Sequence, residues 1–251
     1  MSSIEHYENF PVASWLCPAH LRPAVTALYN FARTADDVAD EGDATPELRL
    51  VELAQYRADL SNCLVNTSAQ SQRWPTLFRA LSRVVQAHGL PVQPLHDLLD
   101  AFEQDVRYTS LGRGYDSRVE LLDYCRRSAN PVGRLMLHLY GVSDDLSLAQ
   151  SDAICTALQL INFWQDREQD LSRGRDYLPK GHSLPQELAF ARQLMAQGAP
   201  LAKRVPGRAG WELRAVVQGG LCILDKLDAH QLRPRLSRLD LARVAWRSLR
   251  M

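Results

Sequence analysis

The chain has 251 residues, 46% of them hydrophobic, and this length is enough to bury a sizeable core without disulfides or structural metal ions. Its 29 basic and 29 acidic residues cancel, so it lacks the positive field of a nucleic-acid-binding protein, and we expect no nucleic-acid partner. The five cysteines are odd in number and widely spaced, which excludes a disulfide framework and a CxxC metal or redox site. With no secretory signal and no apolar run of ~18 residues, we expect a soluble, cytoplasmic protein.

The predicted elements are helices along the whole chain. Apolar residues recur at 3.6-residue spacing almost everywhere, and no segment alternates with period two for long enough to form a sheet. Clusters of Gly, Pro and polar residues divide the chain into about nine helical segments. The loops between them are expected near residues 41–46, 66–75, 89–94, 110–116, 141–147, 171–185, 197–207 and 231–235. No loop is long enough, or low enough in complexity, to link two domains, so we expect one all-α domain over residues 1–251.

The helix expected before residue 41 carries an acidic ridge beside its apolar face. The apolar stripe consists of Val25, Leu28, Ala32, Ala35 and Ala39. The first acidic ridge consists of Tyr29, Arg33, Asp36 and Asp40, at positions i, i+4, i+7 and i+11. Its two carboxylates therefore lie on one face, one helical turn apart, next to buried surface. Because like charges at this spacing repel each other, we expect a positive charge to offset them.

A later helix, before residue 171, carries a similar ladder of oxygen-bearing side chains. The second acidic ridge consists of Gln159, Asn162, Asp166 and Asp170. Oxygen ligands without His or Cys favour Mg²⁺ (or Mn²⁺), which binds carboxylates together with substrate phosphates. Two facing ridges can hold a diphosphate through bridging metal ions. For either ridge taken alone, a solvated acidic face is the alternative.

Other polar residues near the ridges are open to two interpretations. Arg175 lies in the turn after the second acidic ridge, where its guanidinium fork can bind phosphate oxygens, and a surface ion pair with Asp170 is the alternative. Three further aspartates, Asp97, Asp100 and Asp105, are expected to line solvated or pocket-edge turns.

Three blocks of the sequence resemble the squalene/phytoene synthase family. They are the Tyr-x-x-x-Arg-x-x-Asp-Asp-x-x-Asp block at residues 29–40, the block that begins Tyr-Cys and ends Asn-Pro-Val-Gly at residues 124–133, and residues 159–179. The resemblance implies a terpenoid-synthase-like helical bundle with a central apolar cavity, acting on an isoprenoid diphosphate. Candidates for the cavity wall, which border the ridges, are Phe31, Val132, Leu135, Phe163 and Trp164.

The same resemblance implies roles for individual residues. The implied metal ligands are Asp36, Asp37, Asp40, Asn162, Asp166 and Asp170. The implied substrate-binding residues are Tyr29, Arg33, Gln159, Asn162, Arg175 and Tyr177. Catalytic roles are implied for Tyr124, Asp36, Asp40 and Asp166. Tyr124 lies near the reacting carbons in this family, and it is also a candidate for orienting a water molecule.

Residues 8–12, 31–37 and 162–166 look like the branch of the family that converts presqualene diphosphate into hydroxysqualene for squalene and hopanoid biosynthesis. That reaction loses diphosphate and captures water, so Mg²⁺ is implied and NADPH is not expected. The close rival is a head-to-head prenyltransferase that makes presqualene diphosphate, squalene or phytoene from farnesyl or geranylgeranyl diphosphate. A non-catalytic helical scaffold is the alternative from a different class. The sequence departs from the family pattern at Arg126, Arg127 and Asp176.

The end of the sequence is basic. Residues 201–251 hold eleven Lys/Arg against four Asp/Glu. The last predicted helix places Arg243, Arg247 and Arg250 at helical spacing, opposite Leu241, Val244 and Ala245. Such a helix can contact anionic lipid headgroups, which predicts a peripheral position on the inner face of the plasma membrane, and an ordinary solvated helix face is the alternative. Contact with other squalene-pathway enzymes is a further partner that the resemblance implies.

Overall fold

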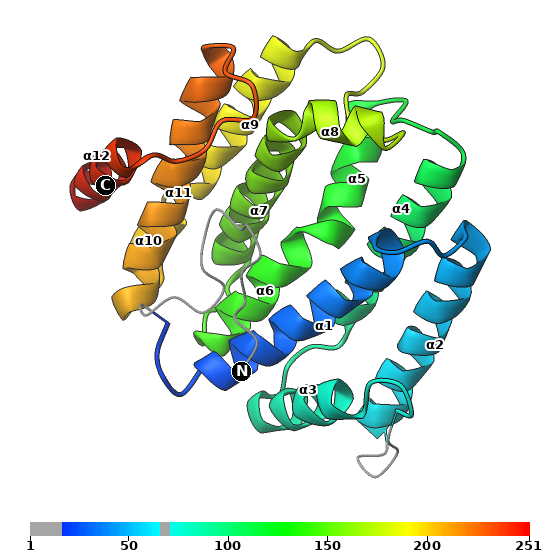
Figure 1. The fold of residues 1–251 in the computed structure, drawn as a ribbon. Helices are drawn as coiled ribbons and strands as arrows, with labels where there is room; N and C mark the ends of the chain where they lie inside the picture. Colours follow the sequence, from blue (N-terminus) through cyan, green and yellow to red (C-terminus); the bar gives the residue numbers. More distant parts are fainter. Residues whose placement is uncertain (1–16, 66–70) are drawn as a thin grey trace.

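The computed structural model describes residues 17–65 and 71–251, and the regular elements of this part of the chain are all α-helices (Figure 1). The helices are α1 Arg22–Asp40, α2 Pro46–Val65, α3 Pro75–His88, α4 Gln93–Ser110, α5 Arg118–Ser128, α6 Asn130–Leu139, α7 Asp145–Gln165, α8 Arg167–Ser172, α9 Leu184–Gly198, α10 Leu201–Arg204, α11 Gly207–Asp228 and α12 Arg238–Arg250. The all-α prediction is confirmed. One domain over residues 1–251 stays a prediction.

Three features divide the described chain more finely than the sequence predicted. The expected helix after residue 116 is two helices, α5 and α6, because Pro131 in the first turn of α6 has no backbone N–H to continue α5. The expected helix that ends near residue 170 breaks at Asp166, whose backbone (φ −101°, ψ 11°) leaves the helical region between α7 and α8. The expected loop at residues 197–207 contains the short helix α10. Within the described residues the loop positions agree with the predicted ones, and residues 66–70 of the loop predicted at 66–75 lie outside the described residues.

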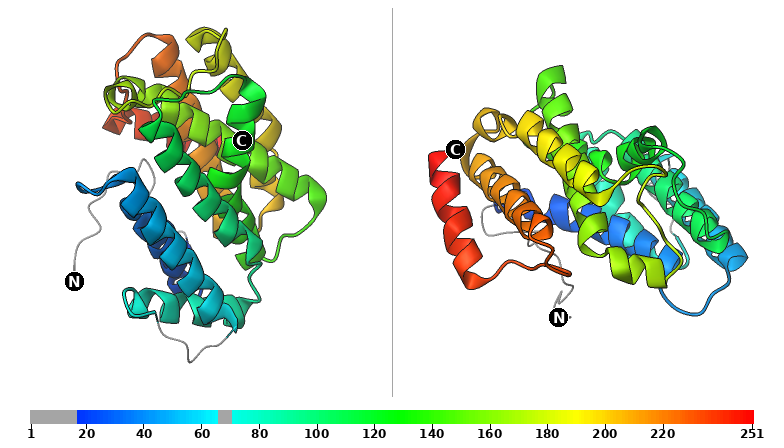
Figure 2. Two further views of the ribbon diagram at one scale, coloured as in Figure 1. Left: turned by 90° about the vertical axis from the view of Figure 1, so that its right-hand side faces the viewer. Right: turned by 90° about the horizontal axis from the view of Figure 1, so that it is seen from above.

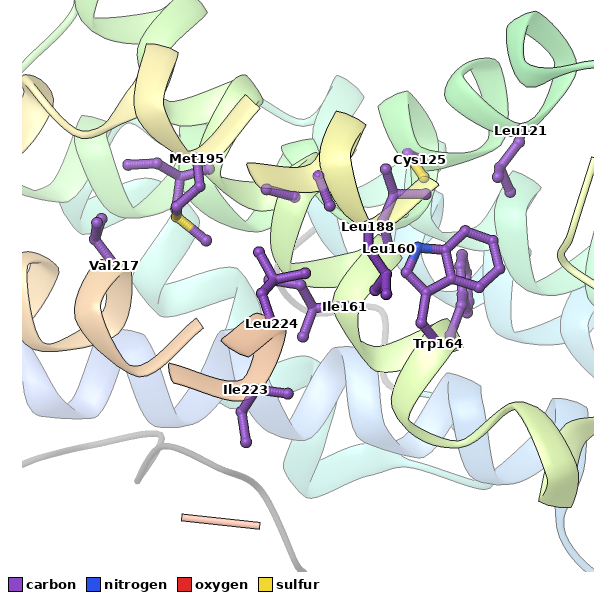
Figure 3. Close-up of a cluster of buried hydrophobic side chains, with 14 of the residues drawn as sticks. Leu121, Cys125, Leu160, Ile161, Trp164, Leu188, Met195, Val217, Ile223 and Leu224 are labelled. Atoms are coloured by element: carbon purple, nitrogen blue, oxygen red, sulfur yellow. The ribbon is translucent and has the colours of Figure 1, made fainter. Parts of the chain in front are cut away.

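The helices enclose two large clusters of buried apolar side chains, besides a small third one of Cys17, Leu21 and Val25. The first lies mainly among α1, α2, α3 and α4, where the rings of Phe31, Tyr56 and Phe78 have centroids 4.8–6.4 Å apart. The second lies mainly among α5, α7, α9 and α11, and Figure 3 shows its side chains, including Leu160 and Leu224. Burying such side chains supplies the main favourable term in folding, and these two clusters hold the helices in place.

The arrangement brings four helix segments to one end of the bundle. The C-terminal end of α1, the junction of α7 with α8, and parts of α4 and α5 meet there, while α12 lies on the outside against α11 (Figures 1 and 2). None of the described helices is both long enough and apolar enough to cross a membrane. The two acidic ridges are therefore presented at one end of a helical bundle.

Candidate active site

The first acidic ridge lies on the half-buried side of α1. Arg33 is its internal counter-charge, with its guanidinium nitrogens 2.7 Å from carboxylate oxygens of both Asp36 and Asp37. Tyr29 lies one turn before Arg33, and Asp40 lies one turn after Asp36. The positive charge that we expected to offset the repelling carboxylates is therefore supplied in part by Arg33 of the same helix.

Burial and neighbouring carboxylates act on the protonation of this ridge. The pKa of Asp36 is raised to about 6, first by burial and then by Asp40 and Asp37, although Arg33 lowers it. The pKa of this carboxyl thus stays raised even with an arginine beside it. An additional positive charge at this position would stabilise the carboxylate form.

The second acidic ridge extends across the junction of α7 and α8. The prediction of one continuous helix through Asp170 was wrong, because α7 ends at Gln165. Helical spacing is nevertheless preserved, since the backbone N–H of Asp166 donates to Asn162 (2.9 Å) and that of Asp170 donates to Asp166 (3.0 Å). Gln159 lies one turn before Asn162 and is half-buried.

Asp170 shows that the two ridges share one electrostatic environment. Its pKa is raised to about 6, first by burial, then by Asp166, and further by Asp40 of the first ridge, while Arg175 lowers it. The carboxylates of α1 and α8 therefore repel each other across the site. This repulsion predicts that the two ridges can share bound cations.

Arg175 connects the loop after α8 to the first acidic ridge. Its guanidinium pairs with Asp40, and its Nε donates to the hydroxyl of Thr109 on α4 at 3.0 Å. The alternative of a surface pair with Asp170 was wrong, because the side chain crosses to α1 instead. Arg173 lies farther out, 3.5 Å from Asp40. A guanidinium already placed among carboxylates can turn toward a phosphate group that enters the site.

A basic residue that the sequence reasoning missed balances the second acidic ridge. Arg233, in the loop between α11 and α12, has its Nε 2.8 Å from Asp166, and Gln165 donates to the carbonyl of Pro234 at 2.5 Å. Arg233 adopts a positive φ of 45°, which is uncommon for a residue with a side chain. Only the basic composition of this stretch pointed toward it, since nothing local relates it to Asp166.

The predicted metal ligands lie near one another but do not form a closed ligand set. Within residues 17–65 and 71–251, no three His, Cys, Asp or Glu side chains gather into a group that could hold a metal ion. The donor chemistry fits Mg²⁺, because the side chains offer carboxylate oxygens and the pKa values of Asp36 and Asp170 are raised by burial and by other carboxylates. Metal binding therefore requires Arg33, Arg175 or Arg233 to release or share its carboxylate partners.

Aromatic rings form a cluster beside the ridges. Phe163 of α7 stacks on Tyr177 with ring centroids 3.7 Å apart and planes 6° from parallel. Tyr115 lies 5.9 Å from Tyr177 and 5.8 Å from Tyr124, and Tyr124 lies 6.1 Å from Phe163. We call these four residues the aromatic cluster. It places electron-rich rings next to the acidic end of the bundle.

Asp105 is a residue whose function the sequence reasoning did not identify. Of the expectation that Asp97, Asp100 and Asp105 line solvated or pocket-edge turns, the turns were wrong, because all three lie within the helix α4. The hydroxyl of Tyr124 donates to Asp105 at 2.6 Å, and burial raises the pKa of Asp105 to about 7, with Tyr124 and Arg175 lowering it. The available signal was its position, since Asp105 follows the buried Ala101 by one helical turn.

The remaining candidates fall into three groups. Phe163 and Trp164 belong to the same buried cluster as Tyr124, whereas Phe31 and Leu135 pack in the first core cluster and Val132 is 48% exposed. A central apolar cavity stays a prediction. Asp176 accepts a hydrogen bond from the backbone N–H of residue 178 within its own turn. Two arginines of α5 depart from the family pattern and pair with the same aspartate, Asp123; Arg126 is exposed and Arg127 is largely buried.

Comparison with known proteins identifies relatives over most of the chain. The squalene/phytoene synthase family model matches residues 4–183. A hydroxysqualene synthase of Zymomonas mobilis is 42% identical over 175 residues, which cover 68% of this chain and 54% of that protein. A hydroxysqualene synthase of Rhodopseudomonas palustris is 39% identical over 174 residues, which cover 69% of this chain and 55% of that protein. The chain thus spans about half the length of these two relatives.

Two further comparisons help to place the chain. A presqualene diphosphate synthase, also of Rhodopseudomonas palustris, is 28% identical over 204 residues, which cover 78% of this chain and 70% of that protein. The crystal structure of squalene synthase HpnC from Alicyclobacillus acidocaldarius matches with a TM-score of 0.79 at 34% identity, covering 90% of this chain and 89% of that one. The all-α bundle is thus shared with a solved structure over nearly its whole extent.

Proposed function

Because the chain belongs to the squalene/phytoene synthase family, we propose that it converts presqualene diphosphate into hydroxysqualene in a Mg²⁺-dependent reaction of squalene and hopanoid biosynthesis. The observation that carries the proposal is the placement of two acidic ridges, bridged by Arg175, beside the Tyr124–Asp105 pair. The greater identity to hydroxysqualene synthases than to the presqualene diphosphate synthase supports this reaction over the preceding one. The overall change is presqualene diphosphate plus water to hydroxysqualene plus diphosphate.

The acidic ridges are the proposed diphosphate end of the site. The residues that would hold Mg²⁺ are Asp36, Asp37, Asp40, Asn162, Asp166 and Asp170. Bound Mg²⁺ supplies neutralisation of the negative charge that develops on the leaving diphosphate. Arg33 and Arg175 contact diphosphate oxygens in this proposal, exchanging carboxylate partners for phosphate. Tyr29 and Gln159, each half-buried on a ridge, complete the polar contacts.

The aromatic cluster is the proposed site of the carbocation. Rings of Tyr124, Phe163 and Tyr177 attract positive charge through their faces and shield it from bulk water, which would otherwise quench the cation at the wrong carbon. The cluster lies next to Arg175 and Asp40, so the cation forms close to the diphosphate that leaves it. The chain in this way separates a polar end of the site from an aromatic end.

Asp105 is the proposed acceptor of the proton from the captured water. When water adds to the carbocation, the new C–O bond leaves a positively charged oxygen that must release one proton. The Tyr124 hydroxyl, 2.6 Å from Asp105, orients the water, and the carboxylate takes the proton. With its pKa raised to about 7 by burial, Asp105 can both accept a proton and release it near neutral pH.

Product analysis tests the proposal directly. Purified protein is supplied with Mg²⁺ and either presqualene diphosphate or farnesyl diphosphate, without and with NADPH. We expect hydroxysqualene from presqualene diphosphate alone, with no requirement for NADPH. Turnover of farnesyl or geranylgeranyl diphosphate to presqualene diphosphate, squalene or phytoene would instead identify a head-to-head prenyltransferase. No turnover of any of these substrates would favour the non-catalytic scaffold.

A further inference from the structure

The apolar side of α12 faces solvent rather than the bundle. Its exposed apolar residues, which we call the outer face, are Leu239, Leu241, Ala242, Ala245, Trp246 and Leu249. Leu239 is 83% exposed, Leu249 65%, Trp246 56% and Leu241 54%. At 100° per residue these positions form one continuous stripe along the helix. Of the three apolar residues that the sequence places opposite the arginines, only Val244 is buried, whereas Leu241 and Ala245 are exposed.

A polar contact holds α12 in this orientation. Asp240 is buried and accepts from the Nζ of Lys226 on α11 at 2.5 Å, and the Ser237 hydroxyl also donates to Asp240 at 2.6 Å. Val244 and Ser248 follow Asp240 at successive helical turns on the same buried side. Because this side of α12 is fixed against α11, the outer face must point away from the bundle. Figure 2 shows α12 at the outside of the bundle, in agreement with this orientation.

Arginines border the outer face on one edge. The side chains of Arg243 and Arg247 are 62% and 43% exposed, and the Arg250 guanidinium lies over the Trp246 ring at 4.1 Å. The only acidic residue of α12, Asp240, is already neutralised by Lys226. Arg247 also pairs with Asp225 of α11 at 3.4 Å, and Arg243 lies 4.0 Å from Asp240, which Lys226 contacts more closely at 2.5 Å. The exposed surface of this helix therefore combines large apolar side chains with more arginines than acidic residues.

We propose that α12 docks the protein on an anionic lipid surface, with the outer face in the headgroup–acyl boundary and its arginines among lipid phosphates. An exposed apolar stripe of this size normally marks an interaction site. The charge decides its partner, because basic side chains beside Trp and Leu match a negatively charged interface, where long arginine side chains extend toward phosphates. This docking goes beyond the proposed reaction and does not depend on it.

The docking face connects to the candidate site through the loop before α12. Leu232, 77% exposed, adjoins Arg233, which reaches Asp166 of the second acidic ridge at 2.8 Å. The segment of residues 229–237 therefore joins the second acidic ridge of the proposed diphosphate site to the helix that carries the outer face.

Co-sedimentation with vesicles tests the docking independently of catalysis. The full chain is mixed with vesicles of phosphatidylglycerol and phosphatidylcholine, or of phosphatidylcholine alone, at about 50 mM and about 500 mM salt. We expect binding to the anionic vesicles at low salt, with much weaker binding at high salt or without phosphatidylglycerol. Absence of binding to the anionic vesicles at low salt would overturn the proposal.

Matched variants locate the contact. Leu241→Gln should lower the vesicle partition coefficient about tenfold, whereas Leu48→Gln on α2, where the leucine is 56% exposed, should change it less than about twofold. Arg243→Gln should lower it about fivefold, and Arg126→Gln, with a side chain 59% exposed, should have little effect. Equal effects of the test and control variants would overturn the proposal.

Light scattering separates the lipid surface from a second copy of the chain. We expect the same molar mass for the unaltered protein and Leu241→Gln in the absence of vesicles. A dimer that Leu241→Gln dissociates would show that the outer face is a subunit interface, and the lipid proposal would fall. Hydroxysqualene formation is then measured in detergent, where Leu241→Gln should match the unaltered protein, so loss of docking and loss of catalysis are read separately.

Discussion

The two acidic ridges are alike in sequence but are balanced in different ways. On α1, Asp36 pairs with Arg33 of the same helix, three residues away. On the junction of α7 and α8, Asp166 pairs with Arg233, which is 67 residues away in the chain. The first ridge thus carries its own counter-charge, whereas the second depends on how α11 and α12 pack. Two similar motifs can therefore respond differently to ligands and to mutation.

The largest expected effect comes from removing a carboxylate from either ridge. Asp36→Asn and Asp166→Asn should each lower kcat at least about 100-fold, because the developing charge on diphosphate loses its metal ligands. Thermal unfolding should show no loss of stability for Asp36→Asn, since the raised pKa of Asp36 shows that its charge is disfavoured in the folded state. Asp43→Asn, an exposed loop position, is the control. Full activity of both ridge variants would favour the scaffold.

Asp105 should give a comparable loss and a distinct pH signature. Asp105→Asn should lower kcat by about 100-fold, because general-base catalysis contributes at least about that much. In the unaltered protein Asp105, with a pKa of about 7, is mostly a carboxylate above pH 7, so activity should fall as the pH drops below 7. The variant should not show this fall in activity. Activity that does not change between pH 6 and pH 8 in the unaltered protein would argue against Asp105 as the base.

The same group gives a stability test with a defined sign. The pKa of Asp105 is about 7 in the folded protein and near its usual value of 3.8 when unfolded, so its buried charge costs stability above pH 7. That cost should disappear as pH falls from about 7 toward about 4. Urea unfolding at pH 8 and pH 6 should therefore show a smaller pH dependence for Asp105→Asn than for the unaltered protein.

Arg175 tests whether the bridge between the ridges matters more than charge alone. Arg175→Gln should lower activity about 30-fold, and Arg175→Lys should restore only part of it, because lysine cannot contact Asp40 and Thr109 together. Arg173→Gln, at 3.5 Å from Asp40 and half-exposed, is the matched control and should cost no more than about threefold. Equal losses of activity for Arg175→Gln and Arg173→Gln would mean that the contacts of Arg175 with Asp40 and Thr109 do not matter for the reaction.

Arg233 is expected to give the smallest effect. Its ion pair with Asp166 is about half-exposed, so Arg233→Gln should change the free energy of unfolding by less than about 1 kcal/mol. We expect a change of only a few fold in the Mg²⁺ concentration needed for half-maximal activity, since Asp166 is then free for the metal. A loss of activity as large as that of Arg175→Gln would contradict the difference between the two acidic ridges described above.

Much of this architecture follows from local sequence. The apolar stripe of α1 and the spacing of Asp36 and Asp40 depend only on the 3.6-residue repeat, and the loops follow the Gly and Pro clusters. The break at Asp166 escaped prediction because no glycine or proline marks it. Asp105 escaped it because a lone carboxylate on a helix reads as solvated until its neighbour, Tyr124 of another helix, is known.

The sequence by itself determined the helical class, the spacing within each ridge and the family resemblance, because periodicity and short motifs are local properties. Only the tertiary structure decided which charges meet: Arg175 reaches Asp40 across 135 residues, and Arg233 reaches Asp166. It also decided that α12 turns its apolar side outward, because the partly buried bond between Lys226 and Asp240 holds the opposite side of the helix against α11. A repeat shows which side chains share a face, but packing alone selects the face that is covered.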